Sequence, residues 1–428
     1  MLSAPRLSPS RHIHRTVLPN GMVVLVLENN TADIIASRIF VRTGGRYETS
    51  DQAGLSHLLM SLITKGTQRL SSLEIAEWVE SMGASLGADS ATDYCLMSLK
   101  TVSQDFPNIL GLAAELLRSP SFPESEVELE RRLTLQGIRS TQEQPFSIAQ
   151  QQLRRAMYGS HPYGRTSLGT EETVARLTRD DLLQFHGTYF RPDNMVISLA
   201  GRITPEAAIA LVEETFGDWP VPQDENGSVS LPVLDIPSVL PAPQRVATAQ
   251  DTQQAIVMLG YLAAPLHSQD YATLKLINTY LGSGLSSRLF VELREKLGLA
   301  YEVSTFYPTR MDTSQFVAYM GTAPGNAAIA LDGLKREVDR LTTTRLTDDE
   351  LQSAKNKFLG QYALGKQTNA QLAQVQGWYE ILGMGLDFDQ AFQDAIAVVT
   401  AEMVQETAQQ YFGNPYFSLV GPAAAIQP

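Results

Sequence analysis

The segment GLSHLLMSLITKGT (residues 54–67) holds one histidine, His57, in a run made mostly of Leu, Met, Ile and Ser. Its apolar residues recur three and four places apart, which predicts a helix that ends near Lys65 and Gly66. The positions between them are largely Ser, Met and Thr, so we expect this helix to be buried on nearly all sides. The segment therefore predicts a core helix, and its histidine raises the question of a metal site.

The residues around His57 argue against metal binding when they are considered alone. His57 and Ser61 share one face of the helix, one turn apart. Zinc needs two or three strong nitrogen, sulfur or oxygen ligands that converge. Neither the hydroxyl of Ser61 nor the thioether of Met60 is such a ligand. This pattern favours a core histidine whose ring has a hydrogen-bond partner.

The composition indicates a globular protein that is soluble. The chain has 428 residues, enough for two or three domains, with 43% hydrophobic and 18% charged residues. No window approaches ~18 consecutive apolar residues, so no membrane span is expected. The net charge of −13 argues against nucleic acid or an anionic membrane as the main partner. Basic or neutral peptides are more compatible with it.

Cysteine usage and the N-terminal segment point to a cytoplasmic location. The single Cys95 cannot form an internal disulfide, which suits a reducing compartment, and a strand cysteine is usually a small buried hydrophobe. Residues 1–21 are rich in Ser and Arg but lack the apolar core of a secretory signal. His12 and His14 form a conceivable metal pair, although an exposed tail is the favoured interpretation.

A proline-rich segment divides the chain. Residues 219–244 contain six prolines and little periodicity, which predicts an extended linker. We therefore expect an N-terminal domain at 1–218 and a C-terminal domain at 245–428.

The two parts repeat each other. LTRDDLLQFHGTYF (177–190) resembles VTAEMVQETAQQYF (399–412), and each predicts a helix capped by Thr and followed by a short apolar strand. FPESEVELERR (122–132) likewise parallels LTDDELQSAKN (346–356). Long helices mixed with hairpin-like strands predict two homologous α+β domains. Each would pack helices on a largely antiparallel sheet.

With these features in view, residues 54–67 resemble the active-site helix of the M16 metallopeptidases, the inverted-zincin family. The zinc motif of that family is His-x-x-Glu-His, in which two histidines bind the metal and the glutamate is the general base. The resemblance extends to LPNGMVVLVLEN (18–29), SHPYGRTSLGT (160–170) and YFRPDNMVISLAG (189–201). It implies a fold of two homologous M16-type α+β domains.

The motif of the family is degenerate in this sequence. His57 matches the first ligand, whereas Met60 stands in place of the base and Ser61 in place of the second histidine. Glu130 and Arg131 match a Glu-Arg pair of the family, but the position of the third ligand, seven places beyond Glu130, is occupied by glycine.

Glycine at that position, Gly137, removes the last expected ligand. One imidazole does not hold zinc or activate water. The resemblance thus implies no cofactor in this chain and no metallopeptidase activity by the chain alone.

The second half keeps the functional residues that the resemblance implies. SRLFVELREKLGLAYEVSTFY (287–307) resembles the segment in which an arginine and a tyrosine seven places apart reach the active site. Here they are Arg294 and Tyr301. A guanidinium and a phenol are suitable donors to a tetrahedral intermediate or to substrate carbonyls. The alternative is that Arg294 makes a surface ion pair and Tyr301 packs at the start of a strand.

The combination implies a subunit of a pair. The family has heterodimers in which only one chain carries the zinc motif. We therefore expect an M16 partner with an intact His-x-x-Glu-His motif, which supplies zinc, while this chain supplies Arg294, Tyr301 and half of the chamber for a peptide substrate. Whether the chain forms a homodimer in isolation stays open, as does action of the Arg/Tyr pair within its own chain.

The segment GASLGADSATDYCLMSL (83–99) resembles the edge strand of the family that pairs with an extended peptide. Its small residues would let a substrate backbone approach closely, and a plain hairpin corner is the equal alternative. The small residues are Gly87, Ala88, Ser90 and Ala91.

Two other functional classes compete with the subunit hypothesis. One is a scaffold without a role in proteolysis, which would be free to lose Arg294 and Tyr301. The other is a peptidase with a displaced metal site, but no acid or histidine stands at ligand spacing from His161, His186 or His267.

Overall fold

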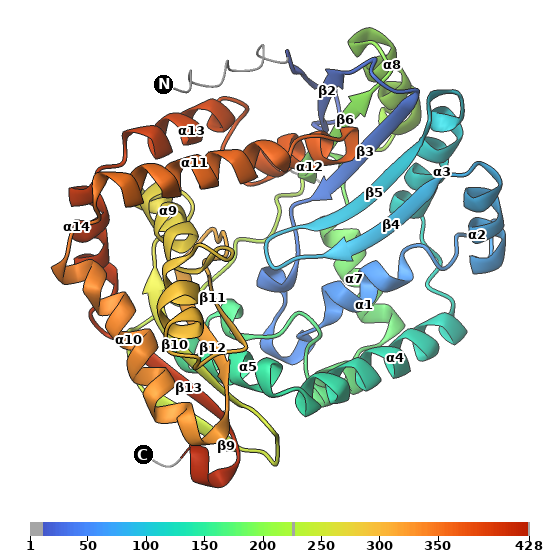
Figure 1. Ribbon diagram of the computed structural model, residues 1–428. Helices are drawn as coiled ribbons and strands as arrows, with labels where there is room; N and C mark the ends of the chain where they lie inside the picture. The colour runs from blue at the N-terminus through green and yellow to red at the C-terminus, as the bar shows by residue number, and fades with distance from the viewer. Residues whose placement is uncertain (1–11, 225–226, 427–428) are drawn as a thin grey trace. The chain divides into compact units, whose positions relative to one another are not determined.

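The computed structural model describes residues 12–224 and 227–426, and its helices and strands form two compact units (Figure 1). The first unit comprises the described parts of 1–134, 171–234 and 365–386. The second comprises 135–170, 235–364 and the described part of 387–428. Each unit has one main sheet covered by helices, as α+β domains require.

The sheet of the first unit has six strands in the order β1-β2-β6-β3-β5-β4. Neighbouring strands are antiparallel except for β2 and β6, which are parallel. Nearly every residue of β6 and β3 is buried. The strands are β1 (His14–Val17), β2 (Val23–Glu28), β3 (Ile34–Val41), β4 (Ser85–Ser90), β5 (Cys95–Val102) and β6 (Met195–Gly201).

The sheet of the second unit repeats this topology with five strands in the order β11-β12-β10-β13-β9. Its one parallel pair is β9 and β13, which corresponds to β2 and β6. The strands are β9 (Arg245–Ala249), β10 (Ala255–Ala263), β11 (Glu302–Phe306), β12 (Ser314–Thr322) and β13 (Tyr416–Gly421). The predicted fold of two similar, largely antiparallel α+β domains is thereby confirmed.

The helices of the first unit divide between a core shared with β2, β3, β5 and β6 and a separate cluster in which α12 packs with Leu27 and Ala200. They are α1 (Leu55–Leu62), α2 (Ser72–Ser81), α3 (Phe106–Arg118), α6 (Glu171–Arg176), α7 (Arg179–Tyr189), α8 (Pro205–Phe216) and α12 (Asn369–Ile381). Helix α4 (Glu124–Glu143) runs through the division between the units at residue 134.

The second unit contains α5 (Pro145–Tyr158), α9 (Tyr271–Gly282), a π-helix (Phe290–Glu295), α10 (Ala327–Thr343), α11 (Asp348–Leu364), α13 (Phe388–Val398) and α14 (Ala401–Tyr411). Short 3-10 turns occur in both units, at Gly45–Tyr47, Ser50–Gln52, Ser103–Asp105, Pro162–Gly164, Pro192–Asn194, Pro324–Asn326 and Ala423–Ala425. The helices predicted at 177–190 and 399–412 are α7 and α14, and the side chains of Thr178 and Thr400 cap them as expected.

One helix on each sheet comes from the other half of the sequence. Helix α12 packs on β3 and β6, and α5 packs on β10 and β13. Glycines permit both contacts: a Cβ on Gly377 of α12 would lie 2.3 Å from the ring of Phe40, and one on Gly260 of β10 would lie 2.8 Å from the sulfur of Met157. The compact units therefore differ from the contiguous division at 1–218 and 245–428.

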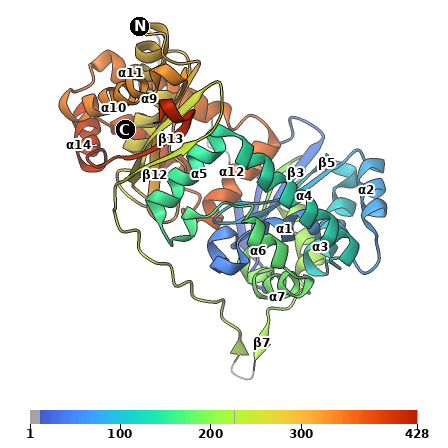
Figure 2. The same ribbon diagram turned by 90° about the horizontal axis from the view of Figure 1, so that it is seen from below.

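The proline-rich segment is extended. Within residues 219–244 a small hairpin, β7 (Gln223–Asp224) and β8 (Gly227–Ser228), precedes a stretch at 229–244 that has neither helix nor strand (Figure 2). The division between the units at residues 234 and 235 falls inside this segment. Among the residues that the structure describes, no helix has the length and apolarity needed to cross a membrane.

Candidate functional site

Helix α1 is anchored by a buried carboxylate. Its N-cap residue, Gly54, has a left-handed backbone with φ of +97°, which favours glycine. Glu48, 6% exposed, accepts hydrogen bonds from the backbone N–H groups of Gly54 at 2.9 Å and Ser56 at 2.8 Å, and from the Ser56 hydroxyl. A negative charge at a helix N-terminus is stabilising because it faces the free N–H groups. Glu48 was not predicted from the sequence, in which its only signal is an acid placed just before a helix that starts at glycine.

Most of α1 is buried, as predicted, because six of its eight residues are buried. The helix ends at Leu62, about one turn earlier than the predicted end at Lys65 and Gly66. The reason is a tight turn in which the N–H of Lys65 donates to the carbonyl of Leu62 at 2.9 Å. Gly66, with φ of +158°, then pairs with Ser71.

His57 is half-buried on α1 and kept neutral by its surroundings. Burial lowers the pKa of its imidazole, and the charges of Asp89 and Glu130 oppose that effect. The hydroxyl of Ser61 donates to the main-chain carbonyl of His57 at 3.0 Å. Among the described residues no hydrogen bond reaches the ring of His57, so the hydrogen-bond partner predicted for it is not found.

The donors around His57 do not fit a zinc ion. Met60 is 2% exposed and offers only a thioether. Glu130 forms an ion pair with Lys65, with its oxygen 3.1 Å from Nζ. Gly137, two turns further along α4, has no side chain. Across the part of the chain that the structure describes, no group of three or more His, Cys, Asp or Glu side chains could hold a metal ion.

Arg131, next to Glu130, has a structural role in α4. Its guanidinium pairs with Glu128 and donates to the carbonyl of Leu177 at 2.8 Å. This contact ties α4 to the segment that leads into α7. It accounts for Arg131 without any contribution to chemistry.

Four of the remaining histidines have ordinary structural environments. Nε2 of His186 lies 2.9 Å from the carbonyl oxygen of Leu117, and burial lowers the pKa of this ring. His267 is exposed. The rings of His12 and His14 have centroids 4.4 Å apart, and His14 belongs to β1 rather than to an exposed tail.

His161 has an acidic neighbour that sequence spacing did not reveal. Its Nδ1 accepts a hydrogen bond from the backbone N–H of Tyr163 at 3.1 Å. Its Nε2 lies 3.6 Å from the carboxylate of Asp312, which is far away in the sequence. A single carboxylate does not complete a metal site.

The predicted substrate segment forms the edge of the first sheet. Gly87, Ala88 and Ser90 belong to β4, which pairs with β5 alone. Ala91 lies in the turn to β5, where its N–H donates to the carbonyl of Tyr94 at 2.8 Å. An edge strand presents unpaired backbone groups that can accept another strand. The segment is thus both an edge strand and one arm of a hairpin.

Cys95, opposite Ser90 on β5, is fully buried. Burial raises the pKa of its thiol well above the ordinary value, and the charges of Glu48 and Asp89 raise it further. A buried thiol with a raised pKa is a poor nucleophile. The interpretation of Cys95 as a small core residue is consistent with this environment.

Arg294 and Tyr301 lie at the end of the second sheet. Arg294 is on the π-helix, and its guanidinium carbon lies 4.7 Å from the ring centroid of Phe290 and 5.7 Å from that of Tyr301. Tyr301 is 79% exposed and directly precedes the edge strand β11. Cation–π contacts with these two rings favour this position of the guanidinium without neutralising its charge. The structure therefore brings the two predicted donors together at an accessible surface.

Comparison with known proteins supports the same family over most of the chain. The sequence profile described as "Insulinase (Peptidase family M16)" matches residues 23–171, and that described as "Peptidase M16 inactive domain" matches residues 176–358. Over 414 residues the chain is 30% identical to "Uncharacterized zinc protease YmxG" of Bacillus subtilis, with 96% of this chain and 98% of that protein covered. It is 28% identical to "Uncharacterized zinc protease SCO5738" of Streptomyces coelicolor, with 96% and 90% covered.

Two solved structures share the fold. A protease from Helicobacter pylori has a TM-score of 0.91 at 22% identity, with 96% of this chain and all of that chain covered. A peptidase M16 inactive domain from Pseudomonas fluorescens has a TM-score of 0.89 at 22% identity, with 97% and 100% covered. The fold is that of two M16-type domains. The chain belongs to the M16 peptidase family.

Proposed function

We propose that this chain is the zinc-less subunit of a heterodimeric M16 endopeptidase of the processing type. In this proposal a partner with an intact His-x-x-Glu-His motif supplies zinc, base and water. This chain supplies Arg294, Tyr301 and half of the chamber that encloses the peptide. The observation that carries the proposal is the contrast between the ligand-poor helix α1 and the accessible Arg294–Tyr301 pair.

The state of the zinc-motif positions supports the first part. The relatives of this chain are named zinc proteases, and they match nearly its full length. At the motif positions, however, the chain offers His57 together with a thioether, a hydroxyl and a glycine. A single imidazole binds zinc too weakly to hold it. The isolated chain is therefore not expected to hydrolyse peptides.

The geometry of Arg294 and Tyr301 supports the second part. During peptide hydrolysis negative charge develops on the carbonyl oxygen of the scissile bond, and fixed donors that face that oxygen lower the barrier. A guanidinium held against Phe290 and Tyr301 is already oriented before substrate arrives, so less conformational entropy is lost on binding. The phenol of Tyr301 adds a second donor. Both side chains would act on the scissile carbonyl at the zinc of the partner.

The edge strand β4 supports a role in peptide binding. An extended substrate can add to the free edge of β4 through main-chain hydrogen bonds. Side chains at Gly87 and Ala88 are absent or small, so a backbone can approach. The net charge of −13 favours basic peptides. A cytoplasmic location is part of the proposal, because Cys95 is buried and requires no oxidising compartment.

The second candidate function is a scaffold or peptide-binding homologue without a role in proteolysis. One observation favours it: the profile that covers Arg294 and Tyr301 is described as an inactive domain. Under this alternative the pair has no catalytic contact. The two functions therefore differ in how sensitive the assembled complex is to substitutions at Arg294 and Tyr301.

The test is reconstitution of peptide cleavage. The chain is assayed alone and after mixing with an M16 chain that carries an intact zinc motif, using basic peptides as substrates. We expect cleavage only in the mixture, and we expect it to fall sharply with Arg294→Ala and with Tyr301→Phe. Cleavage by the isolated chain would refute the proposal. Assembly and cleavage that are insensitive to both substitutions would favour the scaffold.

A further inference from the structure

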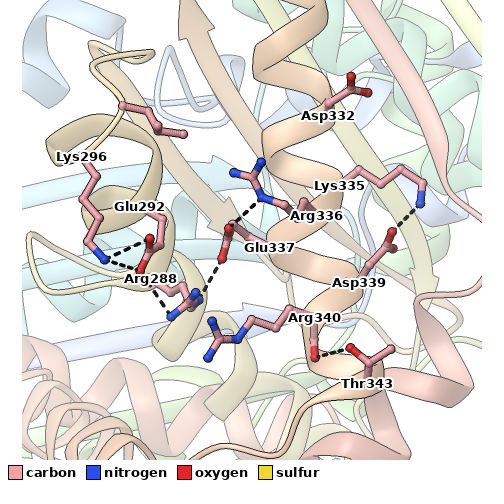
Figure 3. Close-up of a pocket in the computed structure, with 11 residues that line it drawn as sticks. Arg288, Glu292, Lys296, Asp332, Lys335, Arg336, Glu337, Asp339, Arg340 and Thr343 are labelled. Atoms are coloured by element: carbon pink, nitrogen blue, oxygen red, sulfur yellow. Dashed lines mark hydrogen bonds and ion pairs between the residues drawn. The ribbon is translucent and has the colours of Figure 1, made fainter.

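A pocket in the second unit has no role in the function proposed above. It lies between the π-helix with its flanking residues and one face of α10, and its volume is about 810 Å³ (Figure 3). Pockets of roughly 300–1,000 Å³ accommodate small molecules. The two walls are held together where Leu293 packs against Gly333, at which a Cβ would lie 2.9 Å from Cδ2 of the leucine.

Most charges that line the pocket neutralise one another. The buried Glu337 accepts hydrogen bonds from Nε of Arg288 at 2.8 Å and from Nε of Arg336 at 3.3 Å. Glu292 accepts one from Nζ of Lys296 at 3.0 Å. A further pair joins Lys335 and Asp339 along the helix. Each of these groups is paired, and the Lys335–Asp339 pair is separate from the network around Arg288 (Figure 3).

Two charges in the lining stand outside this network. Neither Asp332 nor Arg340 has an ion pair with any residue that the structure describes, and Figure 3 shows both carboxylate and guanidinium without a partner. They are eight residues apart on one face of α10, which separates them by about 12 Å along the helix axis. One end of the pocket therefore carries a free negative charge and the other a free positive charge.

The guanidinium of Arg340 faces the pocket. Figure 3 shows it turned toward the guanidinium of Arg288. The pKa of Glu292 is lowered mainly by its hydrogen bond from Lys296, and the charges of Arg288 and Arg340 contribute to the same shift. A carboxylate that enters here would meet two guanidinium groups, which bind it more strongly than lysine does.

We infer that this pocket binds a short peptide with free termini, its C-terminal carboxylate on Arg340 and its N-terminal ammonium on Asp332. An extended chain advances about 3.3 Å per residue, so three or four residues match the axial separation of Asp332 and Arg340 along α10. Leu297, 52% exposed in the lining, offers an apolar contact to a side chain of the peptide. A ligand with both charges suits the site, because each unpaired group then gains an opposite charge.

The inference goes beyond the proposed function and concerns this chain alone. Peptides of this length are the class of product that an endopeptidase releases. The site would nevertheless bind them whether or not the chain joins a partner, and its failure would leave the proposed subunit role untouched.

The test is calorimetric titration of the isolated full-length chain with tetraalanine, N-acetyl-tetraalanine and tetraalanine amide. We expect saturable binding of the free peptide with a dissociation constant of about 1 mM or tighter, and about tenfold weaker binding when either end is capped. Arg340→Gln should weaken binding of the free peptide about tenfold and remove the effect of amidation. Asp332→Asn should weaken binding of the free peptide by a similar factor and remove the effect of acetylation.

The matched control is Arg345→Gln, which alters an exposed arginine that pairs with Glu402 outside the pocket. It should leave the affinity unchanged. Asp332 and Arg340 are both exposed, so the melting temperatures of all variants should equal that of the parent chain. Equal binding of free and capped peptides, or no saturable binding of tetraalanine, would overturn the inference.

Discussion

The two units share one topology but differ in the helix that follows their central strand. After β3 the first unit has α1, which buries six of eight residues and carries the half-buried, neutral His57. After β10 the second unit has α9, which buries nine of twelve residues and carries Lys275. The comparison shows that a duplicated fold can keep its strands and helices while the chemistry of equivalent elements diverges.

Lys275 is the unusual residue of α9. Its Nζ donates to the carbonyl of Tyr307 at 2.8 Å and lies 5.2 Å and 5.0 Å from the ring centroids of Tyr271 and Tyr307. Burial lowers the pKa of this lysine to about 8, and the charge of Arg310 acts in the same direction. Burial thus disfavours the charged form of both bases, a half-buried imidazole in the first unit and a buried amine between aromatic rings in the second.

The two units also differ in which of their candidate functional residues are accessible to solvent. The second unit exposes Tyr301 and orients Arg294 beside it, whereas in the first unit Met60 is buried at the position of the base. In the proposed heterodimer, each chain needs to keep only its own part of the site. Substitutions in both units test this contrast.

The largest effect is expected from Arg294→Ala in the mixed complex. Loss of one preoriented donor to the transition state lowers kcat about 100- to 1,000-fold, and Tyr301→Phe should have a smaller effect. Steady-state kinetics checks both. The exposed Arg345→Ala is the control and should keep full activity. An unchanged kcat in Arg294→Ala would show that Arg294 does not act on the transition state.

Glu48→Ala tests the anchoring of α1. It removes three accepted hydrogen bonds from a buried site, so we expect the free energy of unfolding to fall by about 2–3 kcal/mol. Glu48→Gln keeps an acceptor and should lose roughly half as much. Urea denaturation measures both. The exposed Glu77→Ala should change stability by less than about 0.5 kcal/mol. An unchanged free energy of unfolding in Glu48→Ala would show that the carboxylate of Glu48 does not stabilise α1.

Ser61→His restores a second imidazole one turn from His57. Two imidazoles on one helical face form a partial zinc site, so saturating zinc should stabilise this variant by about 1–3 kcal/mol. Thermal melting with and without zinc measures the shift. The parent chain and Ser61→Ala should show none. Equal zinc-induced shifts of the melting temperature in all three proteins would show that zinc binds without a second imidazole on α1.

Lys275 of α9 should make the free energy of unfolding depend on pH, and per pH unit this effect is the smallest of the four. The unfolded chain protonates Lys275 up to its ordinary pKa, whereas the folded chain does so only below about 8, so stability should rise with pH between these values. The slope is on the order of 1 kcal/mol per pH unit. Above about pH 10 the raised pKa values of Tyr271 and Tyr307 act in the opposite direction.

Lys275→Met should abolish this rise, whereas the exposed Lys100→Met should retain it. Urea denaturation between pH 8 and pH 10 distinguishes them. Identical pH profiles for the parent chain and Lys275→Met would show that the ammonium of Lys275 is solvated in the folded protein.

Local chemistry in the sequence predicted the repeated elements. Helices α7 and α14 were predictable because Thr178 and Thr400 cap an amphipathic pattern, and the short strands that follow them are apolar. The positions of Arg294, Tyr301 and His57 followed from motif order. The predicted edge strand around Gly87 followed from its neighbours in the family pattern, and the structure has β4 there.

Long-range packing was not predictable in the same way. The exchange of α5 and α12 depends on close contacts at Gly260 and Gly377 with residues far away in sequence. The approach of His161 to Asp312 has the same origin, because ligand spacing along the chain gives no information about such a pair. Glu48 was missed because a carboxylate that caps a helix has no fixed offset from it.

The most direct test of the central claim is the zinc content of the isolated chain after incubation with zinc and removal of unbound metal. We expect far less than one zinc per chain, because His57 is the only strong donor at the motif positions. A content near one zinc per chain would contradict this expectation and would show that residues other than those at the motif positions complete a metal site.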